Sequence, residues 1–258
     1  MIRRFTALLL TMISGITYAQ ETIFTDRPNT TDAVKLLTPG TFQVEAGFLF
    51  EKDDMNGVKN NSYYAPNLIL KYGISKSIEM RVLTDYLTQR VQVDTAETET
   101  SGFTPITISP KLKITDQHVA LPAMSLLTNI TLAKPADEAY ENDLINYGFR
   151  LLLEHVFNDR YSWSHGFGAD WDDTRETVWA YSSSFNIVLN NNLGAFAEIY
   201  GNFAIDYLST HVFDTGLTYL IRDNLQVDAS VGLPLNENAP DLILGFGLAW
   251  RTSLTNSL

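Results

Sequence analysis

Residues 161–171 read Tyr-Ser-Trp-Ser-His-Gly-Phe-Gly-Ala-Asp-Trp and carry a pattern that recurs along most of the chain. Large, mainly aromatic side chains occupy the odd positions, and small or polar side chains occupy the even positions. This period of two gives a β-strand two different faces, whereas an amphipathic helix would need a period near 3.6. The stretch also has about the length of a tilted membrane-crossing strand, roughly 9 to 11 residues. It therefore predicts a transmembrane β-strand.

The same alternation continues over residues 42–251 and predicts about twelve strands. The connections after the second, fourth, sixth, eighth and tenth strands are mostly tight turns. Most of the others are longer, polar and often acidic, as in residues 52–61, 94–102 and 134–142. An even number of strands, with short turns at one end and longer loops at the other, is typical of outer-membrane barrels. The predicted fold is all-β, a transmembrane antiparallel up-and-down β-barrel.

The two ends of the chain differ from this pattern. Residues 1–19 combine Arg3 and Arg4, an apolar core and small residues up to Ala19, which predicts a secretory signal peptide. Residues 20–41 lack periodicity and are expected to form an irregular periplasmic segment. Residues 252–258 form a C-terminal tail without the terminal aromatic residue of many barrels, the nearest aromatic being Trp250. No segment has the roughly 20 apolar residues of a membrane helix.

Composition excludes several classes of function. The chain has no Cys, so disulfides, a lipid-bearing N-terminal Cys and thiol catalysis are excluded. The formal charge of −12 becomes −14 when the two arginines of the signal peptide are removed, so nucleic acid is not an expected partner. No metal-ligand spacing, phosphate-binding glycine loop or nucleotide motif occurs. No cofactor and no metal are therefore expected.

Alternation alone does not decide which face meets lipid, because a secreted β-sandwich alternates too. Three features favour the membrane barrel. The strands are mostly longer than the roughly 5 to 6 residues of soluble sheets. Tyr and Trp gather near strand ends, as in the aromatic girdles of membrane barrels. The less apolar face carries full charges, which a wet lumen tolerates.

The start of the mature chain resembles a known family. Residues Thr25-Asp26-Arg27-Pro28, Thr30-Thr31, Pro39-Gly40 and 43–47 (Gln-Val-Glu-Ala-Gly) are similar to the start of the outer-membrane proteins grouped as the putative MetA pathway of phenol degradation, also called transporter-like. Asn29 departs from the Asp more often expected there. The resemblance implies a signal-bearing barrel with a transport-like role, and it does not imply that phenol is the cargo.

Charged residues on the less apolar face are the main functional candidates. By strand parity they point into the lumen, as constriction candidates: Glu45, Lys71, Glu79, Arg81, Asp85, Lys111, Lys113, Arg150, Glu154, Glu198, Asp206, Asp214, Asp228 and Arg251. One interpretation is a network of paired charges that rigidifies a nearly closed interior. The other is a selective constriction with acidic and basic walls. The glycines at 166, 168, 245 and 247 are interpreted as places where strands bend.

Asp26 and Arg27 are a separate candidate site. They are adjacent opposite charges in the irregular segment, directly before Pro28. One interpretation is a plug that reaches the periplasmic mouth and pairs with charges of the lumen. The other is an ordinary turn that caps the first strand.

An enzyme is the rival class of function. Lipid hydrolysis on the outer wall of a barrel needs a nucleophile within hydrogen-bond reach of its base. His165 is expected to face lipid, and Ser183 would share that face on the next strand. With four His and many Ser, one such pair arises by chance, so no catalytic residue is assigned.

Together these observations predict a protein of the outer membrane of a Gram-negative bacterium. The expected function is a channel or transporter for small molecules, aromatic or hydrophobic ones included. A lipid hydrolase and a structural barrel with a closed lumen remain as alternatives. The expected partners are outer-membrane lipid and an unidentified small cargo.

Overall fold

The computed structural model describes residues 22–55, 57–119, 121–203 and 208–254. The predicted signal peptide, residues 1–19, lies outside this range, as do Asp206 and residues 255–258 of the tail. Among the described residues there is no α-helix, and none of the described segments is a helix long and apolar enough to cross a membrane. The secondary structure is almost entirely β, as the alternation predicts.

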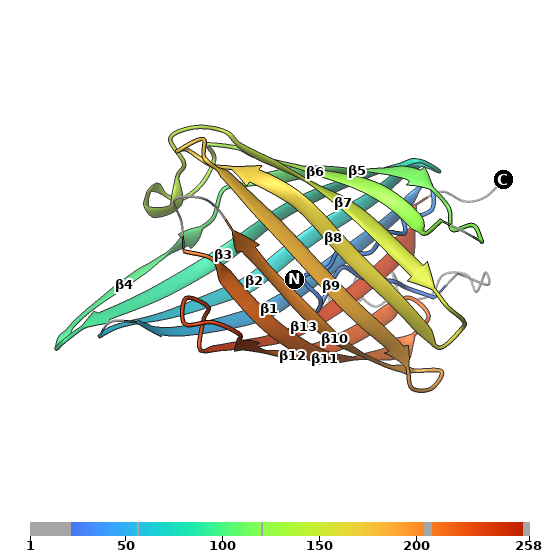
Figure 1. Cartoon of the computed structure of the whole chain (residues 1–258). Helices are drawn as coiled ribbons and strands as arrows, with labels where there is room; N and C mark the ends of the chain where they lie inside the picture. The colour runs from blue at the N-terminus through green and yellow to red at the C-terminus, as the bar shows by residue number, and fades with distance from the viewer. Residues whose placement is uncertain (1–21, 56, 120, 204–207, 255–258) are drawn as a thin grey trace, which may run out of the picture.

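Twelve antiparallel strands close into one barrel, and a thirteenth, β4, pairs only with β3 (Figure 1). The chain order is kept around the barrel from β1 to β13, with β3 followed directly by β5, and β13 pairs with β1 between Ser253 and Thr41. The strands are β1 (Thr41–Met55), β2 (Val58–Ser75), β3 (Ile78–Val93), β4 (Ala96–Phe103), β5 (Thr107–Thr115), β6 (Ala123–Thr131), β7 (Asn146–Val156), β8 (Tyr161–Trp171), β9 (Thr177–Val188), β10 (Leu193–Phe203), β11 (Thr210–Arg222), β12 (Leu225–Pro234) and β13 (Leu242–Ser253).

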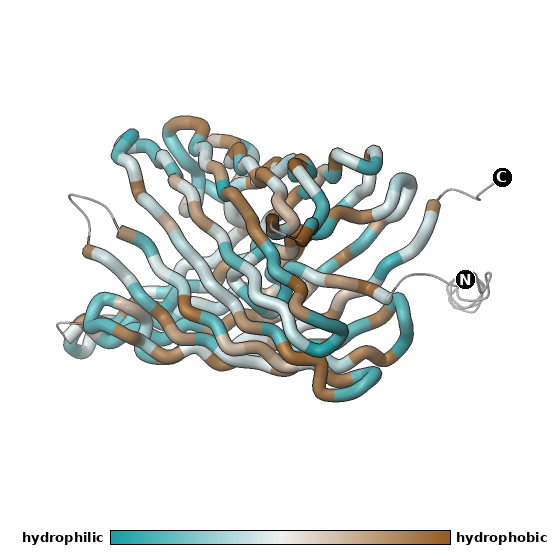
Figure 2. The backbone as a smooth tube through the Cα atoms, turned by 45° about the vertical axis from the view of Figure 1, so that its right-hand side comes forward, coloured by the Kyte–Doolittle hydropathy of each residue, from teal (hydrophilic) through white to brown (hydrophobic). Residues whose placement is uncertain are grey.

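The alternation in β8 explains the two faces of the wall. Trp163 and Phe167 are 44% and 47% exposed on the outside, whereas Ser164 is 7% exposed and faces inward. Rings on neighbouring strands also meet on the outside, such as Phe167 and Trp179 with centroids 5.6 Å apart. Figure 2 shows hydrophobic and hydrophilic residues alternating along the strands. The apolar face therefore points away from the lumen, and the two-sheet sandwich is excluded.

The two ends of the barrel differ as expected. At the end where Thr41 and Ser253 pair, here called the turn end, most connections are short, such as residues 76–77 and 223–224. The opposite end, here called the loop end, carries the long connection 132–145, which contains the short 3-10 helix η1 (Glu138–Tyr140). Alternating turns and loops are the arrangement of outer-membrane barrels.

Two predicted loops are wrong in part, because strands continue through them. Residues 52–61 were expected to be a loop, but β1 runs to Met55 and β2 begins at Val58. Residues 94–102 were also expected to be a loop, but Ala96–Phe103 form β4. Both regions contain few apolar residues and no apolar alternation, so they lack the usual signal of a half-buried strand. These extensions form paired strands beyond the length that a membrane crossing needs.

Candidate functional site

A cluster of charged side chains covers the inner face of four neighbouring strands. Its wall members are Glu45 on β1, Lys71 on β2, Glu79 and Arg81 on β3, and Lys111 on β5, all buried. The register explains their proximity, because Lys71 lies opposite Arg81 and Glu79 lies opposite Lys111. Five of the predicted lumen residues are thus brought together.

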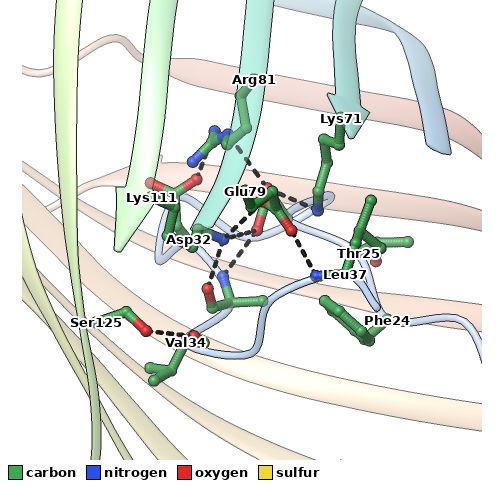
Figure 3. A network of polar contacts seen from close by, with 12 residues as sticks. Phe24, Thr25, Asp32, Val34, Leu37, Lys71, Glu79, Arg81, Lys111 and Ser125 are labelled. Atoms are coloured by element: carbon green, nitrogen blue, oxygen red, sulfur yellow. Dashed lines mark hydrogen bonds and ion pairs between the residues drawn. The ribbon is translucent and has the colours of Figure 1, made fainter. Parts of the chain in front are cut away.

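Residues 22–40, here called the luminal segment, lie against this inner wall. The segment enters at the turn end, where Ile23 N donates to Asp223 O at 2.7 Å, and it ends where Gly40 N donates to Gly73 O at 2.8 Å. Between these points it contacts inward-facing side chains on both sides of the lumen. Figure 3 shows it passing beside Lys71, Glu79, Arg81 and Lys111. This position differs from the periplasmic one expected for residues 20–41.

Asp26 lies among three cations of the wall. Its carboxylate is 2.9 Å from Lys71 Nζ, 3.4 Å from Lys111 Nζ and 3.6 Å from Arg81 Nε. It also accepts a hydrogen bond from Ala33 N at 2.9 Å, which folds the segment back on itself. Burial alone would raise the pKa of Asp26, but the three positive charges outweigh burial and hold the pKa well below its ordinary value.

Charge balance explains why these groups assemble. The wall cluster has three cations and two acids, Glu45 and Glu79, so it carries one excess positive charge. Lys71 is 2.8 Å from Glu45, and Lys111 is 3.6 Å from Glu79. A buried ion without a partner costs several kcal/mol. The segment supplies two carboxylates at this point: Asp26, which lies near all three cations, and Asp32, which lies 2.8 Å from Arg81. The wall therefore favours acidic side chains from the segment here.

Arg27 occupies a space that glycines leave open. Its guanidinium donates to Phe246 O at 3.1 Å and to Asn67 Oδ1, and it lies 3.7 Å from Asp228. A Cβ atom on Gly47 or Gly247 would approach this side chain to about 2.4 or 2.5 Å. Gly247, which was interpreted as a bend, therefore also makes room for Arg27.

The far wall binds the middle of the segment. Glu198 on β10 accepts hydrogen bonds from Thr30 N at 2.7 Å and Thr31 N at 2.8 Å, and from Thr31 Oγ1. Asn29 Nδ2 donates to Ser184 Oγ on β9 at 2.6 Å. The segment is consequently attached to opposite sides of the barrel.

The remaining candidates lie away from the Asp26 cluster. Asp85 accepts from Asn67 Nδ2 at 2.7 Å, Lys113 pairs with Asp116 at 2.5 Å, and Arg150 pairs with Asp170. Three other inward positions are buried, namely Asp214 on β11, Asp228 on β12 and Arg251 on β13, and Glu154 on β7 is partly exposed. Asp214 lies opposite Glu198 in the register.

Sequence reasoning missed several polar residues of the segment. Asp32 pairs with Arg81 at 2.8 Å, and Asn29, Thr30 and Thr31 bind the far wall. The sequence feature that could have indicated these contacts is the number of short polar side chains around Pro28, because such side chains can form hydrogen bonds to a barrel wall.

The proposed hydrolase pair lies on the outer wall. His165 is opposite Ser183 in the register of β8 and β9. Ser183 Oγ accepts a hydrogen bond from Trp163 Nε1 at 2.9 Å, and no hydrogen bond joins the described side chains of His165 and Ser183. No group of three or more potential metal ligands occurs among the described residues.

Space remains on both sides of the luminal segment. A cavity of about 200 Å³ at its loop side is lined by Thr30, Asp32, Arg150 and Leu152, among others. A second cavity, of about 380 Å³, lies at its turn side and is lined by residues 34–39 with Ser125 and Glu154. The segment therefore divides the lumen without filling it.

Comparison with solved structures shows the same fold in outer-membrane proteins. An outer membrane channel from Pseudomonas putida F1 aligns with a TM-score of 0.70 at 13% identity, covering 85% of this chain and 98% of that chain. The KdgM porin gives 0.53 at 9%, covering 81% and 98%. The translocator domain of autotransporter NalP from Neisseria meningitidis gives 0.53 at 8%, covering 84% and 90%. No curated protein matches the chain significantly.

The closed barrel with its apolar exterior is the architecture of a protein of the Gram-negative outer membrane. The family model described as "Putative MetA-pathway of phenol degradation" matches residues 25–252, which is most of the barrel and most of the luminal segment. The chain belongs to this family.

Proposed function

We propose that the protein is an outer-membrane channel for small molecules and that the luminal segment is the plug that narrows it. The observation that carries the proposal is the position of Asp26 among Lys71, Arg81 and Lys111, inside the barrel. A carboxylate held by three buried cations fixes the segment across the lumen, because its withdrawal would remove an acidic partner that all three cations share.

The size of the barrel supports a narrowed passage. Barrels of about eight strands are filled by side chains, and those of about sixteen or more leave an aqueous channel, so twelve strands lie between these cases. The wall of this barrel leaves room for a segment of chain, and the segment leaves cavities of about 200 and 380 Å³ beside it. Small molecules are the cargo that such spaces accommodate.

Two other observations support a channel over the alternatives. Structures with the same fold include proteins described as an outer membrane channel and a porin. The hydrolase alternative would need a hydrogen bond between base and nucleophile, and none joins the described side chains of His165 and Ser183. A structural barrel with a closed lumen is the alternative that an experiment must exclude.

Single-channel recording in planar bilayers tests the proposal. We expect a variant without residues 22–36 to conduct potassium chloride several times better than the wild type, because the obstruction is gone. That deletion also removes an acidic partner of three buried cations. The double variant Glu198→Gln with Asn29→Ala is therefore a milder change, because it weakens only the contacts of the segment with β9 and β10. Folding of each variant is verified by its heat-dependent migration on gels.

A conductance of both folded variants equal to that of the wild type would overturn the plug. The absence of current steps in all three proteins at every voltage would favour the closed structural barrel instead.

A further inference from the structure

A small apolar cluster borders both of the cavities beside the luminal segment. It consists of Val34 from the segment, Leu127 from β6 and Leu152 from β7, which are 4%, 1% and 1% exposed. Leu152 lines the cavity at the loop side, and Val34 lines the cavity at the turn side. We call this cluster the septum.

Strand alternation places the septum between two polar regions. On the inner face of β7, Arg150 lies on the loop side of Leu152, and Glu154 lies on its turn side. In the register, Leu127 is opposite Arg150, and Ser125 is opposite Leu152. The two leucines are therefore diagonal neighbours, and charged or hydroxyl side chains lie next to them on both strands.

The segment is attached differently at this point. Val34 O accepts one hydrogen bond from Ser125 Oγ at 2.6 Å, and the Val34 side chain packs against the two leucines. Asp26, in contrast, contacts three cations, and Glu198 accepts three hydrogen bonds from Thr30 and Thr31. On either side of Val34 the segment is held by the wall, since Ala33 O accepts from Lys111 Nζ at 2.7 Å and Leu37 N donates to Glu79 at 2.7 Å. Displacement of Val34 alone breaks fewer polar contacts than withdrawal of the whole segment.

We infer that cargo passes from the loop-side cavity to the turn-side cavity through the septum while the segment stays docked at Asp26 and Glu198. An apolar constriction excludes water and hydrated ions by dewetting, since a charge in a dry site has a high free energy. The septum thus selects small uncharged molecules with an apolar surface. This inference rests on the proposed channel function.

The volume of the loop-side cavity sets the size of the cargo. It measures about 200 Å³, and a dry cavity of roughly 150 Å³ is enough to bind benzene. A single ring with one small substituent therefore fits. Arg150, Asp170 and Thr30 line the same cavity and offer hydrogen bonds to one polar group on such a molecule.

Polar substitutions in the septum test its role as a barrier to ions. We expect Leu127→Ser and Leu152→Ser each to raise the conductance of potassium chloride several-fold, because a hydroxyl hydrates the constriction. Ile243→Ser is the matched control, since Ile243 is also a buried inward-facing residue but packs with Val212 and Ala239, away from the septum. Its conductance should equal that of the wild type.

Two probes with the same ring test the selectivity. Benzyl alcohol is uncharged, and benzoate carries one negative charge. The assay uses intact cells, because their lipopolysaccharide slows the entry of both probes. Relative to cells without the protein, cells with the wild type should take up benzyl alcohol faster and benzoate at the same rate. Leu152→Ser should admit benzoate as well.

Several outcomes would overturn the septum. They are equal entry of both probes through the wild type, wild-type conductance in both folded septum variants, or an equal rise in the Ile243→Ser control. If the conductance rises in the variant without residues 22–36 but not in the septum variants, the proposed path through the septum is wrong and the proposed channel function is retained. If none conducts, the channel itself is wrong.

Discussion

The sequence predicts which charged residues face the lumen, but not how they are arranged there. Strand parity predicts that Glu45, Lys71, Glu79, Arg81 and Lys111 point inward, and all five do. Parity cannot predict that they form one cluster, because the register between neighbouring strands depends on turns and bulges such as those after Tyr64 and Gly73. It also cannot reveal that carboxylates from outside the strands pair with these cations.

The substitution Asp26→Asn tests how much the negative charge of Asp26 contributes to the stability of the barrel. The substitution keeps the shape of the side chain but removes the negative charge from among Lys71, Arg81 and Lys111. We expect a loss of about 3 kcal/mol of stability, the cost of removing one partner of a buried ion pair. The measurement is urea unfolding followed by gel migration. Glu97→Gln, at an exposed position of β4, should have no effect, and an equal loss in both variants would contradict the account.

The same carboxylate has a defined pH dependence. Because the wall cations lower the pKa of Asp26 below its ordinary value of 3.8, its contribution is fully present above that value. The contribution is lost as the pH falls through the lower pKa of the folded state. The stability difference between wild type and Asp26→Asn should therefore stay constant from pH 8 to pH 5 and shrink only in strong acid. A difference that disappears by pH 6 would contradict the assignment.

Among the strands, the sequence predicted those with an apolar outer face and missed those without one. The segment Tyr161–Trp171 is a strand as expected, because large side chains mark its outer face. Strand β4 was missed because its alternating Glu and Thr residues do not distinguish a hydrated strand from a loop. The apolar luminal residues Leu127 and Leu152 were also missed, since they break the expectation of a polar inner face.

The tip of the β3–β4 hairpin should be dispensable for the barrel. Strand β4 pairs only with β3, and the barrel closes between β3 and β5. Deletion of residues 91–93 and 96–98 keeps the turn at Asp94 and Thr95 and shortens the hairpin tip (Figure 1). We expect unchanged heat-dependent migration and unchanged conductance. Failure of the barrel to assemble would show that the hairpin supports folding.

At the scale of the whole molecule, alternation predicted the barrel but not its contents. An even number of strands with an apolar exterior implies a closed wall, which is what the twelve strands other than β4 form. The luminal segment has no period, so its sequence does not indicate on which side of the wall it lies. The sequence did point to Asp26 and Arg27 as residues that pair with charges of the lumen. Their contacts with Lys71 and Asp228 support the proposed plug.

The position of residues 22–40 inside the barrel can be tested by cross-linking, because the natural chain has no Cys. Asn29→Cys combined with Ser184→Cys places two thiols where Asn29 Nδ2 and Ser184 Oγ are 2.6 Å apart. Asn29→Cys with Ser183→Cys is the control, since Ser183 is the adjacent residue and faces outward, against Trp163. After oxidation, we predict a disulfide, seen by mass and by faster non-reducing migration, in the Ser184 pair and not in the Ser183 pair. Equal cross-linking in both pairs, or none with Ser184 in the folded barrel, would contradict a segment docked within the lumen.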